Sequence, residues 1–147
     1  MAKLVRILRR KRLPGLAALA AILLVVLIAI FGRAQKKADL NTLEGRQRFL
    51  EEQGWEIDLG SEKHKTVRIP VSLDGVIADY NDIQLQQGCD LSKHLGQTCE
   101  QYSYTVTNYP DKEQTVLVTL YIRNGKLIAG DVHSTALDGF MQGLKRE

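Results

Sequence analysis

Cysteine is scarce in this chain of 147 residues, which contains two, Cys89 and Cys99. They do not form a C-x-x-C pair, so a thioredoxin-type redox site is not indicated. No cysteine follows the apolar run near the N-terminus, and this excludes a lipid-modified cysteine anchor. The three histidines, His64, His94 and His133, are scattered without H-x-x-x-H spacing, so the usual pattern of a zinc site is also missing.

Acidic residues are absent from the first 37 positions, which carry nine Lys and Arg. The remaining residues carry eleven Lys and Arg against all 17 Asp and Glu, a net charge of −6. An acidic domain repels the phosphates of nucleic acid, so the composition excludes nucleic acid as a partner. The basic residues near the N-terminus have another explanation, which follows from the apolar run beside them.

Residues 13–32, LPGLAALAAILLVVLIAIFG, contain no charge. In a helix rising about 1.5 Å per residue they reach roughly 30 Å, the thickness of a bilayer core. Six basic residues precede the run and three follow it closely, which predicts a cytoplasmic N-terminus. We therefore expect a basic cytoplasmic segment at 1–12, a single transmembrane helix at 13–32, a polar tether at 33–41 and an extracytoplasmic domain at 42–147.

A signal peptide and a buried core helix are the two alternatives to a membrane anchor for this run. A cleaved signal peptide has a shorter apolar region, and Gly32-Arg33-Ala34 is a poor cleavage site. A fully buried core helix needs more surrounding chain than residues 33–147 supply. The anchor predicts the lipid bilayer as a partner, and its basic flank favours anionic lipids on the inner leaflet.

The patterns of residues 42–147 predict an α+β domain. Helices are expected at about 42–53, from Ser72 to Gly88 and from Thr135 to Leu144; strands are expected at 55–59, 66–69, 102–107, 116–122 and 126–128. Asn124-Gly125 is typical of a two-residue hairpin turn and closes the last two strands. The predicted fold is a transmembrane helix followed by a small antiparallel β-meander, three-stranded and packed with amphipathic helices.

Several spaced strings stand out in this domain: Ile69-Pro70, Tyr80-Asn81, Gln87–Leu91, Tyr102–Pro110, and Gly130–Val132 followed by Ala136–Met141. In them the chain resembles an uncharacterised family of short, single-pass, membrane-anchored proteins of Firmicutes, chiefly Clostridia, whose outer part is a domain of unknown function. The resemblance covers about residues 42–144 and implies an extracytoplasmic domain in a Gram-positive bacterium. It brings no catalytic residue, ligand or partner, and the cysteine pair departs from the family pattern.

Cys89 and Cys99 are separated by nine residues across a predicted loop. Outside the cytoplasm such a pair can oxidise to a disulfide. The alternatives are two small apolar side chains that never meet and, less favoured, a reactive or metal-binding pair in which His94 joins the two cysteines. Asp79, Asp82 and Asp90 lack the spacing of a calcium loop and are interpreted as a solvated face. We expect no metal and no cofactor.

Asp131, His133 and Ser134 are the residue types of a hydrolytic triad, but His133 and Ser134 are adjacent on a predicted strand end, which separates base from nucleophile. Ser134 or Thr135 is expected to cap a helix instead. Tyr102, Tyr104, Asn108 and Tyr109 have two interpretations: core tyrosines whose hydroxyls reach the rim, or an aromatic recognition surface. We expect no catalytic residue, and Tyr102, Tyr104, Asn108 and Tyr109 are the candidate recognition surface.

The sequence predicts a non-enzymatic, membrane-anchored binding or regulatory module for a protein, peptide or envelope component. One alternative is an assembly subunit of a membrane complex, because Ala17-Ala18-Leu19-Ala20-Ala21 permits close packing of membrane helices. The other is an envelope enzyme, against which the absence of a nucleophile and base pattern counts.

Overall fold

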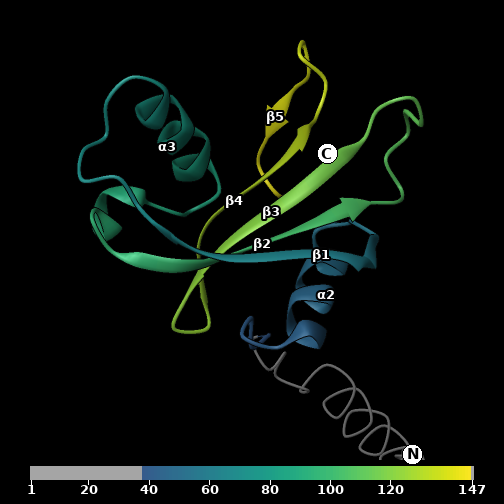
Figure 1. The fold of residues 1–147 in the computed structure, drawn as a ribbon, viewed down its shortest axis with the longest axis horizontal. Coiled ribbons are helices and arrows are strands. Elements are labelled where there is room, and N and C mark those ends of the chain that lie inside the picture. The colour runs from purple at the N-terminus through teal and green to yellow at the C-terminus, as the bar shows by residue number, and fades with distance from the viewer. Residues whose placement is uncertain (1–37, 147) are drawn as a thin grey trace, which may run out of the picture. The chain divides into compact units, whose positions relative to one another are not determined.

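The computed structural model describes residues 38–146, which form an α+β domain (Figure 1). The elements are α2 (Leu43–Glu52), β1 (Ile57–Arg68), α3 (Val76–Gln86), the 3₁₀ turn η1 (Leu91–His94), β2 (Thr98–Val106), β3 (Val116–Arg123), β4 (Lys126–Ser134) and β5 (Met141–Gln142). The strands make one antiparallel sheet in the order β1-β2-β3-β4-β5. The predicted α+β class and antiparallel meander are confirmed, and the meander has five strands where three were predicted.

Within residues 38–146, no helix combines the length and the hydropathy needed to cross a bilayer. The predicted segment 1–12 and membrane helix 13–32 lie outside the described residues and stay predictions. The predicted tether 33–41 is described from Ala38 onward, and Leu40 is already buried in the main core. The packed domain therefore begins a few residues before the predicted boundary.

The helix predicted at 42–53 is α2. Thr42 caps it, because the Thr42 hydroxyl accepts a hydrogen bond from the Gly45 N–H at 3.0 Å. The spacing of Asn41 and Glu44 has the form of a capping box and predicts Asn41 for this position, one residue too early. Gly54 follows the helix with a φ of 92°, a left-handed conformation that glycine adopts without strain, and it ends α2 as predicted.

The two short strands predicted at 55–59 and 66–69 are parts of one strand, β1. The register of β1 against β2 shifts between Asp58 and Lys63. Within this bulge the Ser61 hydroxyl donates to the Asp58 carbonyl at 2.6 Å and accepts from the Thr105 N–H at 2.8 Å. A side chain thus satisfies backbone groups that the bulge leaves unpaired, and the strand continues past Gly60.

The second predicted helix is α3, but it begins four residues later than Ser72. The Ser72 hydroxyl donates to the Asp74 carboxylate at 2.9 Å and does not cap the helix. Gly75, with a φ of 50°, is the residue before the first turn. Gly88, with a φ of 80°, follows the helix as predicted. A glycine in a left-handed conformation therefore stands at each end of α3.

The helix predicted from Thr135 to Leu144 is wrong. Residues 135–140 make a turn, and β5 then pairs with Val132 and His133 of β4. In the predicted helix, Leu137 and Leu144 would lie on the same apolar face. In the structure Leu137 is fully exposed and Leu144 is buried.

The extended course of this segment is set by contacts of the Leu144 backbone. The Trp55 indole N–H donates to the Leu144 carbonyl at 2.5 Å, and the Gln87 side-chain carbonyl accepts from the Leu144 N–H at 2.8 Å. Gly139 and Gly143 each lower helix stability by about 1 kcal/mol relative to Ala, so local propensity does not oppose these contacts.

The two faces of the sheet differ in polarity. On the α2 side Val116, Val118, Leu120 and Ile122 of β3 pack with Leu50 and Trp55 in the main core. The intervening residues Thr119 and Tyr121 lie on the α3 side, because side chains alternate along a strand. That side carries only a smaller apolar cluster, made of Ile69, Leu91, Cys99, Ile128 and Ala129. The main core is closed by α2, while the face toward α3 remains partly polar.

Gly130→Ala is predicted to lower the free energy of unfolding by about 1–3 kcal/mol, the usual cost of overpacking. A Cβ at Gly130 would lie 2.7 Å from Leu144 Cδ1 and 2.9 Å from the Thr119 carbonyl oxygen. Urea unfolding of the full chain, followed by the fluorescence of the single tryptophan, Trp55, measures the loss. Gly60→Ala is the control, since its Cβ would meet only Asp58 Oδ1, at 3.3 Å. An equal loss in both variants would contradict the packing explanation.

Candidate functional site

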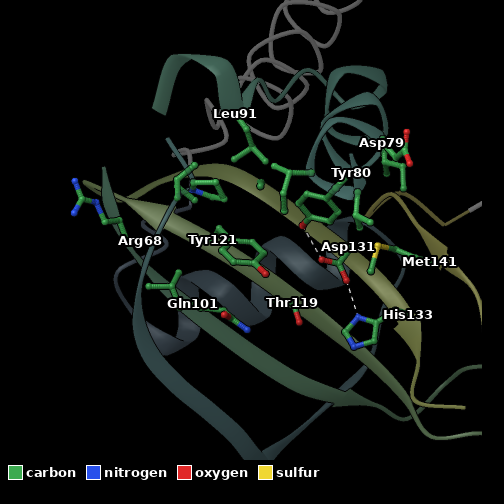
Figure 2. Close-up of a pocket in the computed structure, with 17 residues that line it drawn as sticks. Arg68, Asp79, Tyr80, Leu91, Gln101, Thr119, Tyr121, Asp131, His133 and Met141 are labelled. Atoms are coloured by element: carbon green, nitrogen blue, oxygen red, sulfur yellow. Dashed lines mark hydrogen bonds and ion pairs between the residues drawn. The ribbon is translucent and has the colours of Figure 1, made fainter. Parts of the chain in front are cut away.

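A pocket of about 520 Å³ opens between α3 and the face of the sheet that this helix covers (Figure 2). Its apolar walls include Ile77 and Ile83 of α3, Val67 of β1 and Ala129 of β4. Polar groups on its floor come from three neighbouring strands: Gln101 of β2, Thr119 and Tyr121 of β3, and Asp131 and His133 of β4; Arg68 of β1 and Asp79 and Tyr80 of α3 also line it. The volume lies in the range of small-molecule sites, which are mostly apolar with a few convergent polar groups.

Side-chain amides hold α3 over this face. The Gln84 side-chain carbonyl accepts from the Gly130 N–H at 2.8 Å, and the Gln87 side-chain amide donates to the Gly130 carbonyl at 2.7 Å. The same Gln87 amide donates to the Gln84 side-chain carbonyl at 2.6 Å. The C-terminal end of α3 is thus fixed to the backbone of β4, and the N-terminal half of the helix lies over the pocket.

Tyr80, Asp131 and His133 form a hydrogen-bonded row inside the pocket (Figure 2). The Tyr80 hydroxyl donates to Asp131 Oδ2 at 2.7 Å, and His133 Nδ1 lies 2.6 Å from Asp131 Oδ1. Asp131 is only 2% exposed, so both of its oxygens depend on these two partners. The His133 side chain keeps 26% of its surface exposed.

The environment shifts the titration of the groups around Asp131. The hydrogen bond to Asp131 raises the pKa of His133, because the carboxylate stabilises the imidazolium. Burial, together with the charge of Asp131, raises the pKa of Tyr121 to about 12. Burial and Asp131 also raise the pKa of Tyr80. Both tyrosines therefore present neutral hydroxyl groups, while the hydrogen bond to Asp131 favours the protonated form of His133.

The residues of the predicted recognition surface lie outside the pocket beneath α3. Tyr104 is fully buried, and its hydroxyl donates to Glu62 at 2.5 Å and accepts from Arg46 Nε at 2.6 Å. Tyr102 is half-buried, with the Arg46 guanidinium 3.7 Å from its ring centroid and the His64 ring stacked at 4.5 Å. These two tyrosines belong to the face packed against α2, so the core interpretation applies to Tyr104.

Asn108 and Tyr109 also make internal contacts. The Asn108 side chain accepts from the Glu56 N–H and donates to the Gly54 carbonyl. The Tyr109 ring stacks on Phe140, with the ring centroids 5.2 Å apart. Both residues are half-buried and tie loops together. None of the four residues predicted to form the recognition surface lines the pocket beneath α3.

Both cysteines are free thiols in the structure. Cys89 is half-buried just after α3, and Cys99 is buried in the smaller apolar cluster. Burial raises the pKa of both thiols, which disfavours the reactive thiolate. Among residues 38–146, no group of three or more His, Cys, Asp or Glu side chains converges as a metal site would require.

Asp131 and His133 do meet, whereas Ser134 does not join them. Ser134 is buried, and its hydroxyl accepts from the Ala136 N–H in the turn that replaces the predicted helix. No hydroxyl or thiol of the described chain makes a hydrogen bond to His133 Nε2. The arrangement therefore has the base and its orienting carboxylate without a bonded nucleophile.

Sequence reasoning missed the pocket as a site. The alternation of Thr119 with Tyr121 and of Asp131 with His133 was a signal that one sheet face is polar. It did not show that α3 lies over that face, since Tyr80 is 51 positions from Asp131 in sequence.

The contribution of His133 to stability is predicted to depend on pH. Its pKa is raised in the folded state, so the contribution is full below the unfolded pKa of about 6.5 and is lost as pH rises through the folded pKa. Urea unfolding from about pH 5.5 to pH 8.5 measures the free energy of unfolding of the wild type and of His133→Gln. The wild type should be the more stable at low pH, and the difference should shrink as pH rises. In an Asp131→Asn background the same comparison should be nearly independent of pH. A pH-dependent difference that persists there would assign the effect to another partner.

Comparison with known proteins yields no match: no protein-family model, no curated protein and no solved structure is significantly similar to this chain.

Proposed function

We propose that this chain is a membrane-anchored, extracytoplasmic binding or regulatory module whose outer domain takes its ligand in the pocket beneath α3. The observation that carries the proposal is the pocket itself, a half-open apolar space with polar groups gathered on its floor. The partner is a protein, peptide or envelope component that offers an apolar group to this space. The proposal moves recognition from the predicted tyrosine surface to the opposite face of the sheet.

Two exposed apolar residues at the mouth of the pocket support binding. Val76 is 80% exposed at the rim, Met141 is also exposed there, and both line the pocket. Exposed apolar residues at the mouth of an apolar pocket are typical of a binding site.

The anchor is the second part of the proposal. The uncharged run 13–32, its basic flank and the resemblance to single-pass proteins of Firmicutes support a cell-membrane location with the domain outside. This arrangement would present the pocket to envelope components.

The row formed by Tyr80, Asp131 and His133 is assigned to binding and not to catalysis. An acyl-transfer triad needs a nucleophile hydrogen-bonded to the base, and within residues 38–146 the His133 ring is hydrogen-bonded to Asp131 alone. We accordingly propose a non-enzymatic module.

The topology is tested by a reporter fused after Glu147. A phosphatase that folds only outside the cytoplasm should be active there, and a reporter that fluoresces only inside should be dark. The expected result follows from the excess of basic residues before the run 13–32. Activity of the cytoplasmic reporter alone would overturn the proposed location.

Binding through the pocket is tested by photo-cross-linking in cells from a benzophenone side chain at position 76, on the rim. The adduct should persist when residues 13–32 are replaced by an unrelated apolar helix. It should be lost in Ile83→Trp, which fills the pocket. Leu85→Trp is the matched control, because Leu85 is exposed on the same helix and does not line the pocket. An adduct lost on the helix swap but kept in Ile83→Trp would favour an assembly subunit acting through its membrane helix.

A further inference from the structure

We propose that the pocket beneath α3 binds a small apolar carboxylic acid, with the carboxylate on His133 Nε2 and the apolar body between α3 and the sheet. This inference rests on the proposed function and names the ligand class of the same site.

The His133 ring has a fixed orientation in the pocket. Its Nδ1 is held 2.6 Å from the buried Asp131, so the proton on that nitrogen is committed to the carboxylate. The other ring nitrogen, Nε2, makes no hydrogen bond to any residue of the described domain. Figure 2 shows the ring at the polar end of the pocket, near Thr119. A fixed ring with one free nitrogen presents that nitrogen to a ligand.

The charged groups around His133 determine which ligand charge the pocket favours. The charged and titratable side chains that line the pocket with it are Arg68 of β1, Asp79 and Tyr80 of α3, Tyr121 of β3 and Asp131 of β4. Asp79 is exposed at the rim. The Arg68 Nε donates to the Gly96 carbonyl, and in Figure 2 its guanidinium lies away from the polar floor. The charged pair on the floor is therefore His133 with Asp131.

The floor of the pocket has unused hydrogen-bond donors. Both oxygens of Asp131 already accept hydrogen bonds, from Tyr80 and from His133, so this carboxylate has little to offer a ligand cation. The protonated ring, by contrast, has an unused N–H on Nε2, and the hydrogen bond to Asp131 favours the protonated form. The Tyr121 hydroxyl and the Gln101 amide are further donors on the same floor. The unused N–H of the imidazolium matches an anion, and a carboxylate pairs with it through a charge-assisted bond.

The walls determine the rest of the ligand. Ile77 and Ile83 of α3 and Val67 and Ala129 of the sheet supply apolar walls, and the neighbouring Asp79 is exposed at the rim. An apolar chain or ring fits this space, and its burial supplies about 25 cal/mol per Å² of apolar surface. The pocket volume of about 520 Å³ suits a molecule of small-ligand size.

The test uses the full-length chain in nanodiscs with ring-labelled histidine, and three ligands that share one chain: octanoate, 1-octanol and octylammonium. His133→Gln identifies the His133 signal in the NMR spectrum. At about pH 6, octanoate should bind at least roughly tenfold more tightly than the other two. It should also raise the pKa of His133, because binding and protonation are reciprocally linked, while 1-octanol should leave that pKa unchanged.

Variants separate the pocket from the bilayer. Ile83→Trp should abolish the octanoate effect, and Leu85→Trp should keep it, with equal partition of ligand into the same lipid. His133→Gln should keep the binding of 1-octanol, which shows that the pocket is intact, and should lose the preference for octanoate. Equal or tighter binding of 1-octanol or octylammonium, or an unchanged His133 pKa with octanoate, would overturn the carboxylate assignment and leave the binding function standing. Failure of all three ligands to perturb pocket signals would overturn this ligand class, and the cross-link from position 76 then decides whether the pocket binds a larger partner.

Discussion

The hydrogen bonds at Gly130 are the constraint on which the site depends. The N–H and the carbonyl of this β4 residue are paired with the side-chain amides of Gln84 and Gln87, where another strand would otherwise pair. Because Gly130 has no side chain, Leu144 packs directly against its Cα. The same Gln87 accepts from the Leu144 N–H, and the Leu144 carbonyl accepts from Trp55. One glycine thereby connects α3, the sheet, the C-terminal segment and the main core.

This connection explains why the two helices differ in role. The side of α2 that includes Leu50 is buried in the main core, and Arg46 adds buried contacts to Tyr104 and Glu62. The attachment of α3 to the sheet is mainly polar and lies near the C-terminal end of the helix. One of its donors, the Gln84 side-chain amide nitrogen, is buried with no partner in the described domain. An unsatisfied buried donor costs about 1–3 kcal/mol, so α3 is held less firmly than α2.

The pocket and the hydrogen-bonded row on its floor follow from this difference. If α3 packed on the sheet in the way that α2 does, its apolar side chains would fill the space over the polar face. Since α3 contacts the sheet at one end and through Tyr80, space remains over β2, β3 and β4. Asp131 is then buried between Tyr80 and His133, and the orientation of the His133 ring follows from that bond. A packed apolar core on one face thus lies opposite a pocket on the other, an arrangement suited to a binding module.

Local sequence predicted the elements whose signals are local. The periodicity of α2, the alternation of β2 and β3, and the Asn124-Gly125 turn correspond to the structure, in which Asn124 has the positive φ of 52° that such a turn needs. The uncharged run 13–32 and the charge asymmetry are also properties of the sequence by itself. They suffice to predict an anchor, since a bilayer selects for length and hydropathy.

The tertiary structure decided what depends on distant partners. Local periodicity favoured a helix at 135–144, but the backbone contacts of Leu144 with Trp55 and Gln87 hold this segment extended. Alternation placed Asp131 and His133 on one face, yet only the position of α3 brings Tyr80 to Asp131. It likewise determined that Tyr104 is buried beside Arg46, while a pocket opens on the opposite face of the sheet. Long-range hydrogen bonds and burial join residues tens of positions apart, and no local pattern encodes those pairings.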